Sequence, residues 1–276
     1  MMIDAHQHFW APARGDYGWM QAEGLEALRR PIGPADYAPH RAAFGIDATV
    51  LVQAAPTLAE THYMLGIADA TDWVAKVVGW VDFERPEERA ALDALAAHPK
   101  FAGARPMIQD IPDVDWIHRA DVQWGFEALA ELDLSLDALG FPQHLDGFLA
   151  LFQRHPTLRV VVDHCAKPRI RAGEFDDWAR GIAAIARETP AFCKLSGLVT
   201  EASEDWTTDA LRPFAEHVLD VFGPERVMWG SDWPVLELAG TFGAWRAAAE
   251  AIVPDAMHAD VFGGTAARFY RIGESG

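Results

Sequence analysis

Eight short apolar runs rich in β-branched residues divide the chain, and they constrain its fold more than any other feature. They are Met2–Ala5, Thr49–Gln53, Lys76–Asp82, Ala102–Ile108, Leu134–Leu139, Leu158–Asp163, Phe192–Ser196 and Arg226–Gly230. Between them lie stretches with the 3.6-residue periodicity of helices, for example Arg85–Ala97, Gln123–Leu132, Leu145–Arg154 and Asp176–Glu188. This alternation predicts a parallel sheet with helical crossovers. Eight units in 276 residues favour a closed (β/α)8 TIM barrel, a fold of about 250 residues.

The first run ends in histidines, which argues against an open doubly wound sheet. That arrangement usually has a Gly-rich phosphate loop after its first strand. The stretch from Phe9 to Pro39 breaks the repeat, and it carries Trp10, Tyr17, Trp19 and several prolines. We expect it to be a long first βα loop over the barrel mouth, where such loops build active sites. The sequence has no internal repeat or linker, so we expect one domain over residues 1–276.

The charge balance excludes several classes of partner. The formal net charge is −18, with a sequence pI near 4.9 and no run of Lys or Arg, so we expect neither nucleic-acid nor anionic-membrane binding. The opening MMIDAHQHFW lacks the charged and apolar regions of a signal peptide, so we expect none, and no apolar run reaches membrane-spanning length. The cysteines Cys165 and Cys193 both close apolar runs and predict buried free thiols. We expect a cytoplasmic protein that acts on a small molecule; a monomer and a homodimer both stay open.

Two histidines stand at the end of the first run, in Asp4-Ala5-His6-Gln7-His8. Side chains at i and i+2 of a strand point to the same face, so His6 and His8 should project together into the barrel mouth. Two adjacent imidazoles favour an occupant between them, such as a metal ion, a water molecule or an anionic ligand. We interpret this pair as functional.

A third histidine and a carboxylate end two later strands. His164 follows the apolar run Val160–Asp163, and Asp232 follows the last run. Catalytic residues of barrels collect at such strand ends, and the last strand lies beside the first in a closed barrel. Asp232 could therefore reach both histidines, as a metal ligand or as a general base. The structural alternative for Asp232 is a helix N-cap.

The pattern of these elements resembles the amidohydrolase superfamily, and in particular its lactonase branch of sugar-lactone and pyrone-dicarboxylate lactonases. The matching phrases span almost the whole chain: IDAHQHFW (3–10), VGWVDF (78–83), DHCAKP (163–168), CKLSGL (193–198), FGPERVMWGSDWPV (222–235) and ARFYRI (267–272). The chain is most similar to L-fucono-1,5-lactonase-like members, which open aldonolactones.

The resemblance implies a role for each candidate. Asp232 would activate the hydrolytic water, while His6, His8 and His164 would hold the lactone carbonyl or one divalent metal and stabilise the oxyanion. Binuclear members carry a lysine near the fourth strand; here Arg105 stands in that region, so two metals are not expected. One Zn²⁺ on His6, His8 and Asp232, with His164 as a further ligand, is favoured over catalysis without a metal, which stays open.

Further residues are candidates for substrate binding. Arg105 and Lys194 lie near strand ends, as do the hydrogen-bonding candidates Gln53, Glu60 and His144. Trp10, Trp19 or Trp233 could stack on a sugar ring. We interpret Lys167 as a structural ion-pair partner of Asp163 or Glu201. Two departures from the branch are Pro106, where His usually follows the Arg, and Thr265, where Asn is usual.

The sequence therefore predicts a hydrolase that opens a 1,5- or 1,4-sugar lactone to the aldonic acid. Three alternatives stay open: a metal-dependent decarboxylase of the same superfamily, a non-catalytic sugar-binding barrel, and a lactonase for a dicarboxylate lactone from aromatic breakdown. The last would need several cations at the mouth, where the sequence places only Arg105 and Lys194.

Overall fold

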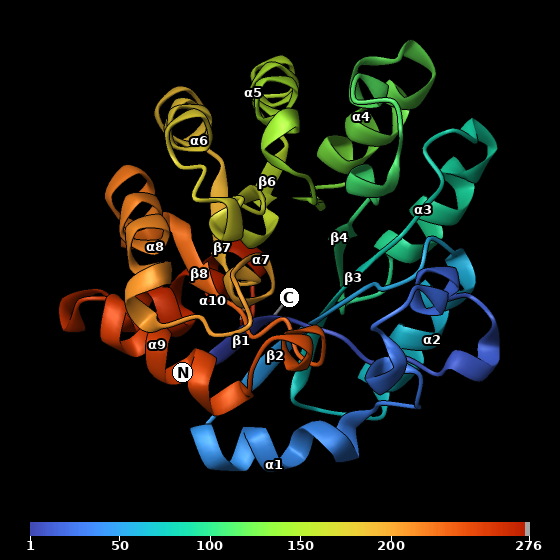
Figure 1. Ribbon diagram of the computed structural model, residues 1–276. Helices are drawn as coiled ribbons and strands as arrows, with labels where there is room; N and C mark the ends of the chain where they lie inside the picture. Colours follow the sequence, from blue (N-terminus) through green and yellow to red (C-terminus); the bar gives the residue numbers. More distant parts are fainter. Residues whose placement is uncertain (274–276) are drawn as a thin grey trace.

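Eight parallel strands form a nearly closed barrel, with helices around them (Figure 1). The computed structural model describes residues 1–273. The strands pair in chain order and are β1 (Ile3–Gln7), β2 (Ala48–Val52), β3 (Val74–Gly79), β4 (Phe101–Ala104), β5 (Ser135–Ala138), β6 (Arg159–Val162), β7 (Phe192–Leu195) and β8 (Val227–Trp229). The predicted (β/α)8 TIM barrel is confirmed.

The helices are α1 (Pro34–Phe44), α2 (Leu58–Asp69), α3 (Arg89–Ala96), α4 (Gln123–Glu131), α5 (Leu145–Arg154), α6 (Asp176–Glu188), α7 (Leu198–Glu201), α8 (Thr208–Phe222), α9 (Phe242–Ile252) and α10 (Thr265–Tyr270). The clearest amphipathic stretch, α6, buries Trp178, Ile182 and Ile185 at helical spacing. The predicted run Ala102–Ile108 forms a strand only as far as Ala104. It ends there because Pro106 has no N–H for the ladder.

The first and last strands meet through backbone hydrogen bonds. The Asp232 N–H donates to the His6 carbonyl at 2.8 Å, and the His8 N–H donates to the Trp233 carbonyl at 2.8 Å. Gln7 and Trp233 accordingly form a parallel bridge. The residues at the end of β1 and those just after β8 therefore lie side by side at the carboxyl ends of the strands.

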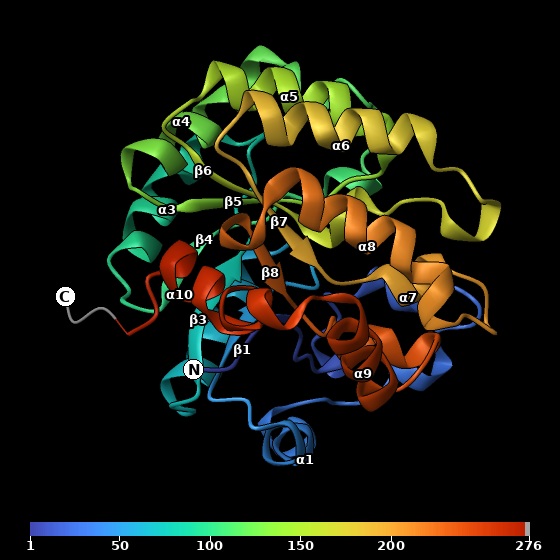
Figure 2. The same ribbon diagram turned by 90° about the vertical axis from the view of Figure 1, so that its left-hand side faces the viewer.

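The opposite end of the barrel is covered by α10, which lies on the same side of the molecule as the start of β1 (Figure 2). Phe269 and Tyr270 of α10 pack with Ile3, Ala5 and apolar side chains from the other strands in the barrel interior. Phe269 contacts Phe192 at the start of β7, with ring centroids 4.8 Å apart. The interior is thus packed from below, and the mouth is left for the polar residues.

The segment after β1 departs from regular structure as predicted, but only as far as Gly33, because α1 begins at Pro34, inside the stretch Phe9–Pro39 that the sequence predicts to be loop. It contains three short 3-10 turns, at Pro12–Arg14, Gly18–Gln21 and Glu26–Leu28. The Trp19 indole N–H donates to the Ala54 carbonyl at 2.7 Å, so this loop is fastened to the loop after β2. The loop therefore covers part of the mouth.

Candidate active site

The four predicted site residues come together at the barrel mouth. Asp232 Oδ1 lies 3.2 Å from His8 Nε2, 3.8 Å from His6 Nε2 and 3.8 Å from His164 Nε2. All four residues are buried, with 0–4% of their surface exposed. One carboxylate oxygen thus faces three imidazoles.

A β-bulge in β1 aims the two histidines. Asp4 pairs with Thr49 and Gln7 with Leu51, so β1 has one extra residue between these pairs. Ala5 packs in the barrel interior, and His6 also points inward, next to Lys194 and Arg105. Asp4 instead accepts a hydrogen bond from Tyr37 of α1 at 2.7 Å. Strict alternation would have placed Asp4 with the histidines; the bulge re-aims the strand, a common device next to active sites.

Hydrogen bonds orient two of the imidazoles. His8 Nδ1 lies 2.7 Å from the Val52 carbonyl, and since a carbonyl only accepts, Nδ1 carries the proton. Its Nε2 therefore faces Asp232. His164 Nδ1 lies 2.8 Å from the Ser196 hydroxyl, which fixes the second ring. Such outer contacts hold a ring in its working orientation.

The turn that carries His164 has an unusual backbone. His164, Cys165, Ala166 and Lys167 have φ values of 52°, 53°, 57° and 48°, and Asp232 has a φ of 57°. Left-handed conformations of this kind are unfavourable for residues with a Cβ and often occur at functional sites. The turn returns Lys167 to the same mouth as His164.

Burial and neighbouring charges set the protonation of the site. The pKa of His6 lies well below its usual value because the ring is buried and because Lys194, His8 and Arg105 lie close to it. Burial also holds the pKa of His164 well below its usual value. Burial alone would raise the pKa of Asp232, but its contacts with His164 and His8 bring that pKa below the ordinary range. Near pH 7 the site therefore contains an ionised Asp232 carboxylate beside the neutral imidazoles of His6 and His164.

These donors can hold a divalent metal. Ligand atoms of His6, His8 and Asp232 all lie within 4.8 Å of one another, as do those of His6, Asp163 and His164. Neutral imidazoles and a carboxylate are the forms that bind zinc. His8 suits a metal ligand, because it holds its proton on Nδ1 and leaves Nε2 for a ligand bond.

Arg105 and Lys194 surround His6 in different ways. Arg105 Nη1 lies 3.3 Å from His6 Nε2 and 3.4 Å from Asp163 Oδ2, and the side chain also lines the mouth. Lys194 is fully buried, with Nζ 2.5 Å from Asp137 Oδ2, 3.0 Å from Asp163 Oδ1 and 3.1 Å from His6 Nδ1. The Lys194 ammonium thus supports His6 from inside the barrel.

A cavity of about 310 Å³ opens above these groups. Among the described residues its polar lining is His8, Arg105, Gln109, Asp110, His164, Lys167 and Asp232, and its apolar lining is Trp19, Leu25, Ala54, Met107, Leu139, Val235 and Leu238. Concave sites of this kind usually combine apolar walls with a few convergent polar groups. The cavity therefore places a small ligand against the Asp232 carboxylate.

Several predicted substrate-binding residues lie outside this lining within residues 1–273. The Gln53 amide donates to the Arg105 carbonyl at 2.7 Å, and the Trp233 indole donates to Glu237 at 2.8 Å. His144 Nδ1 accepts the Phe141 N–H at 3.0 Å. These side chains, like Lys194, fasten loops and neighbours around the mouth, so their direct contact with substrate stays a prediction.

Glu60 also lies behind the described lining of the cavity and holds a loop of the mouth. Its carboxylate accepts the backbone N–H groups of Ala54 and Ala55, and burial raises its pKa to about 7. Ala54 lines the cavity, so Glu60 shapes the wall from behind.

Sequence reasoning missed part of the lining. Met107, Gln109 and Asp110 come from the loop after β4. Met107 falls inside the run Ala102–Ile108 that predicts a strand, and Gln109 and Asp110 follow that run without a recognisable motif. The sequence predicts Lys167 as an ion-pair partner of Asp163 or Glu201, and its Nζ lies 3.8 Å from Glu201 Oε1. The Lys167 side chain also lines the cavity, which the sequence did not predict. The two cysteines are buried and free, as predicted.

The chain matches the family described as Amidohydrolase over residues 3–272. It is 45% identical to L-fucono-1,5-lactonase of Burkholderia ambifaria, over 98% of this chain and 95% of that protein. It is 35% identical to L-fucono-1,5-lactonase of Burkholderia multivorans, over 99% and 97%. A crystal structure of an amidohydrolase from B. multivorans with bound zinc superposes with a TM-score of 0.90, at 34% identity and 99% coverage of both chains.

Within residues 1–273, none of the helices combines the length and the apolar character that a membrane crossing requires.

Proposed function

Since the chain belongs to the amidohydrolase family, we propose that it hydrolyses the ring ester of a sugar lactone, of the L-fucono-1,5-lactone type, and releases the aldonic acid. One observation carries the proposal: a buried carboxylate oxygen of Asp232 faces three imidazoles at the wall of a cavity. The names of the full-length relatives support the same substrate class.

Asp232 acts as the general base. Its lowered pKa keeps the carboxylate ionised at neutral pH, so it can accept a proton from a water molecule in the cavity. The water oxygen bonds to the lactone carbonyl carbon, and the bond from that carbon to the ring oxygen then breaks. The proton held on Asp232 passes to the departing ring oxygen.

Arg105 and His164 stabilise the charge that forms on the carbonyl oxygen. Both line the cavity, and the Arg105 guanidinium is a planar cationic donor. A preorganised donor of this type is commonly worth about 3 kcal/mol in the transition state. Ser196 keeps His164 in place through its 2.8 Å contact.

His6, His8 and Asp232 would hold one zinc ion. When bound, zinc supplies a positive charge that polarises the carbonyl and lowers the pKa of water. The zinc in the related B. multivorans structure supports this choice of metal.

The charges at the mouth favour a neutral substrate. Before any metal binds, the described lining contains two cationic side chains, Arg105 and Lys167, and two carboxylates, Asp110 and Asp232. A dicarboxylate lactone would bring two further anions into this balanced cavity. A sugar lactone brings hydroxyl groups that either charge type can bind.

We place this activity in carbohydrate catabolism in the cytoplasm. The net charge of −18 favours an aqueous compartment and a small-molecule partner over a nucleic acid or an anionic membrane. Assembly into a homodimer stays a prediction.

A lactone panel tests the proposal. Aldono-1,5- and 1,4-lactones, a pyrone dicarboxylate and an aromatic carboxylic acid are incubated with the purified protein, with and without chelator. Acid release from the lactones is followed with a pH indicator, and CO2 release from the aromatic acid is measured separately. We expect turnover of at least one aldonolactone. Turnover of the pyrone dicarboxylate alone, or decarboxylation of the aromatic acid alone, would contradict the proposal.

A further inference from the structure

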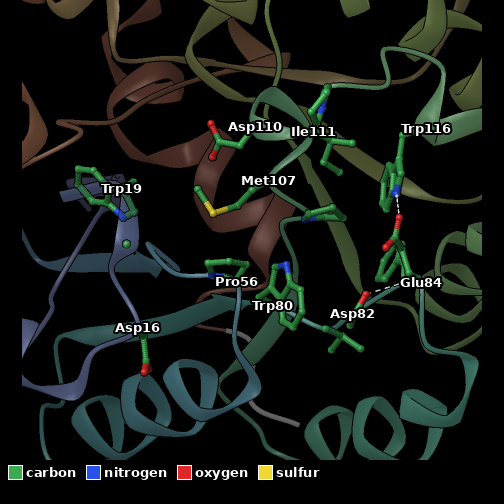
Figure 3. Close-up of a pocket in the computed structure, with 15 residues that line it drawn as sticks. Asp16, Trp19, Pro56, Trp80, Asp82, Glu84, Met107, Asp110, Ile111 and Trp116 are labelled. Atoms are coloured by element: carbon green, nitrogen blue, oxygen red, sulfur yellow. Dashed lines mark hydrogen bonds between the residues drawn. The ribbon is translucent and has the colours of Figure 1, made fainter. Parts of the chain in front are cut away.

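A second, larger cavity adjoins the active-site cavity. It encloses about 790 Å³ and is formed by the loops after β3 and β4 together with the first βα loop (Figure 3). Trp19, Met107 and Asp110 line both cavities and so form their common border. We call the second space the outer cavity. The two cavities therefore lie side by side at the barrel mouth.

The walls of the outer cavity are largely aromatic. Trp19, Trp80, Phe83 and Trp116 contribute rings to it. Figure 3 shows Trp80 between Pro56 and Asp82, with Met107 and Asp110 across the space. The Trp19 and Trp116 indole N–H groups are bonded to Ala54 and Glu84. Trp80 is partly exposed, and within residues 1–273 no hydrogen-bond partner is found for its indole N–H.

The polar groups of the outer cavity are hydrogen-bond acceptors. Asp16, Asp82, Glu84 and Asp110 line it, and the described lining includes no Lys, Arg or His. A phosphorylated or carboxylated ligand is therefore disfavoured there.

Three of these carboxylates already have donors from the protein. Asp16 pairs with Arg14 at 2.7 Å, and Glu84 pairs with Arg119 at 2.8 Å. Asp82 Oδ1 accepts the Glu84 N–H at 2.9 Å. Because their charge is partly compensated, they suit the hydroxyl groups of a neutral ligand better than they suit a free cation.

We propose that the outer cavity binds a second, neutral sugar ring that is joined to the lactone, so that the enzyme accepts glycosylated aldonolactones. This inference rests on the proposed function of the active site. The C–H face of the second ring stacks on Trp80, and its hydroxyls contact the carboxylates. The reaction is unchanged: water adds to the lactone carbonyl, the ring ester bond breaks, and the glycosidic bond stays intact.

The test compares parent lactones with their glucosylated forms. The aldonolactone that turns over best and its 2- and 3-O-glucosyl derivatives are assayed with the wild type and with Trp80→Leu. Trp80 lines only the outer cavity, so we expect kcat/KM for the preferred glucosyl lactone to fall about tenfold, a change of about 1.4 kcal/mol. The value for the parent lactone should stay within about twofold of wild type, since the catalytic groups are unchanged.

Trp73→Leu is the matched control. Trp73 precedes β3 and Trp80 follows it, both are partly buried, and Trp73 lines neither cavity. This variant should treat parent and glucosyl lactones as the wild type does. An equal loss on both substrates in Trp80→Leu, or no turnover of any glucosyl lactone beside good turnover of the parent, would overturn the inference.

A binding measurement separates this inference from the proposed function. The methyl glycoside of the corresponding disaccharide, which cannot be hydrolysed as a lactone, is titrated while tryptophan fluorescence is followed. We expect saturable binding that Trp80→Leu weakens and Trp73→Leu leaves intact. Binding without any lactone turnover would refute the proposed function alone. No binding of the disaccharide glycoside would refute the outer cavity as a sugar site. Binding of tetramethylammonium, a probe for a cation site, instead of the disaccharide glycoside would also refute it.

Discussion

Lys194 brings three polar groups together beneath the active site. Its ammonium contacts Asp137, Asp163 and His6, and the Tyr270 hydroxyl completes the cluster by donating to Asp137 at 2.7 Å. Burial raises the pKa of Asp137 despite the nearby ammonium, whereas Lys194 and Arg105 bring the pKa of Asp163 below its usual value. The Lys194 ammonium is thus shared by a buried acidic pair, of which Asp163 also faces Arg105, and it contacts an imidazole that we assign to the metal.

Replacing this lysine should destabilise the fold. Lys194→Met leaves two buried carboxylates without their shared cation, and we expect the free energy of unfolding to fall by about 3–5 kcal/mol. Urea denaturation at neutral pH measures this loss. The double variant Lys194→Met/Asp137→Asn removes one of the stranded charges and should recover part of it. A loss below about 1 kcal/mol in the single variant would show that the cluster does not depend on the ammonium.

At the scale of elements, a β-bulge and a left-handed turn decide where the site residues point. The bulge in β1 brings His6 inward after Ala5, and the left-handed turn after β6 carries His164 and Lys167 to one cavity. The turn after β7 leaves room for them. Gly197 has a φ of 66°, and a Cβ there would lie 2.7 Å from the His164 ring.

Gly197→Ala should therefore displace His164 and lower kcat, because the added methyl cannot fit beside the ring. Gly173→Ala is the matched control: its φ is 69°, but a Cβ there meets nothing within 4 Å. Both variants should lose about 1 kcal/mol of stability from backbone strain, measured by thermal unfolding. Only Gly197→Ala should lose lactonase activity; equal activity in the two variants would contradict this role of Gly197.

Sequence reasoning predicted the barrel and the strand-end position of the four central residues, because both follow from local periodicity and from barrel geometry. It could not predict the bulge or the left-handed turn, since each depends on contacts made by other elements. The same holds for Lys194 and Glu60. Their position near strand ends was visible, but whether each faces the cavity or the protein is decided by buried partners far away in the chain.

For the whole molecule, closure of the barrel brings the end of the first strand next to the residues that follow the last strand. His6 and His8 come from the first strand, and Asp232 follows the last, so a ligand held by all three bridges the seam between β1 and β8. A ligand of this kind binds the folded state and not the unfolded chain. Its binding energy then adds to stability.

Zinc should consequently raise the unfolding temperature of the protein. At a free zinc concentration of about 100 times Kd, the expected gain is about 2.7 kcal/mol. Thermal melts of chelator-treated protein with and without added zinc, alongside the measured metal content, test this. His8→Ala should remove most of the gain. Unchanged melting together with no retained zinc would contradict the metal assignment.

The most direct test of the account is the kcat/KM of Asp232→Asn on the best aldonolactone, measured with the pH-indicator assay beside a thermal melt. Asn is nearly isosteric with Asp but cannot accept the proton from water. We predict a fall of roughly a hundredfold to ten-thousandfold, the usual contribution of a general base, in a protein that stays folded. A variant that turns over the lactone at close to the wild-type rate would contradict the assignment of Asp232 as the base.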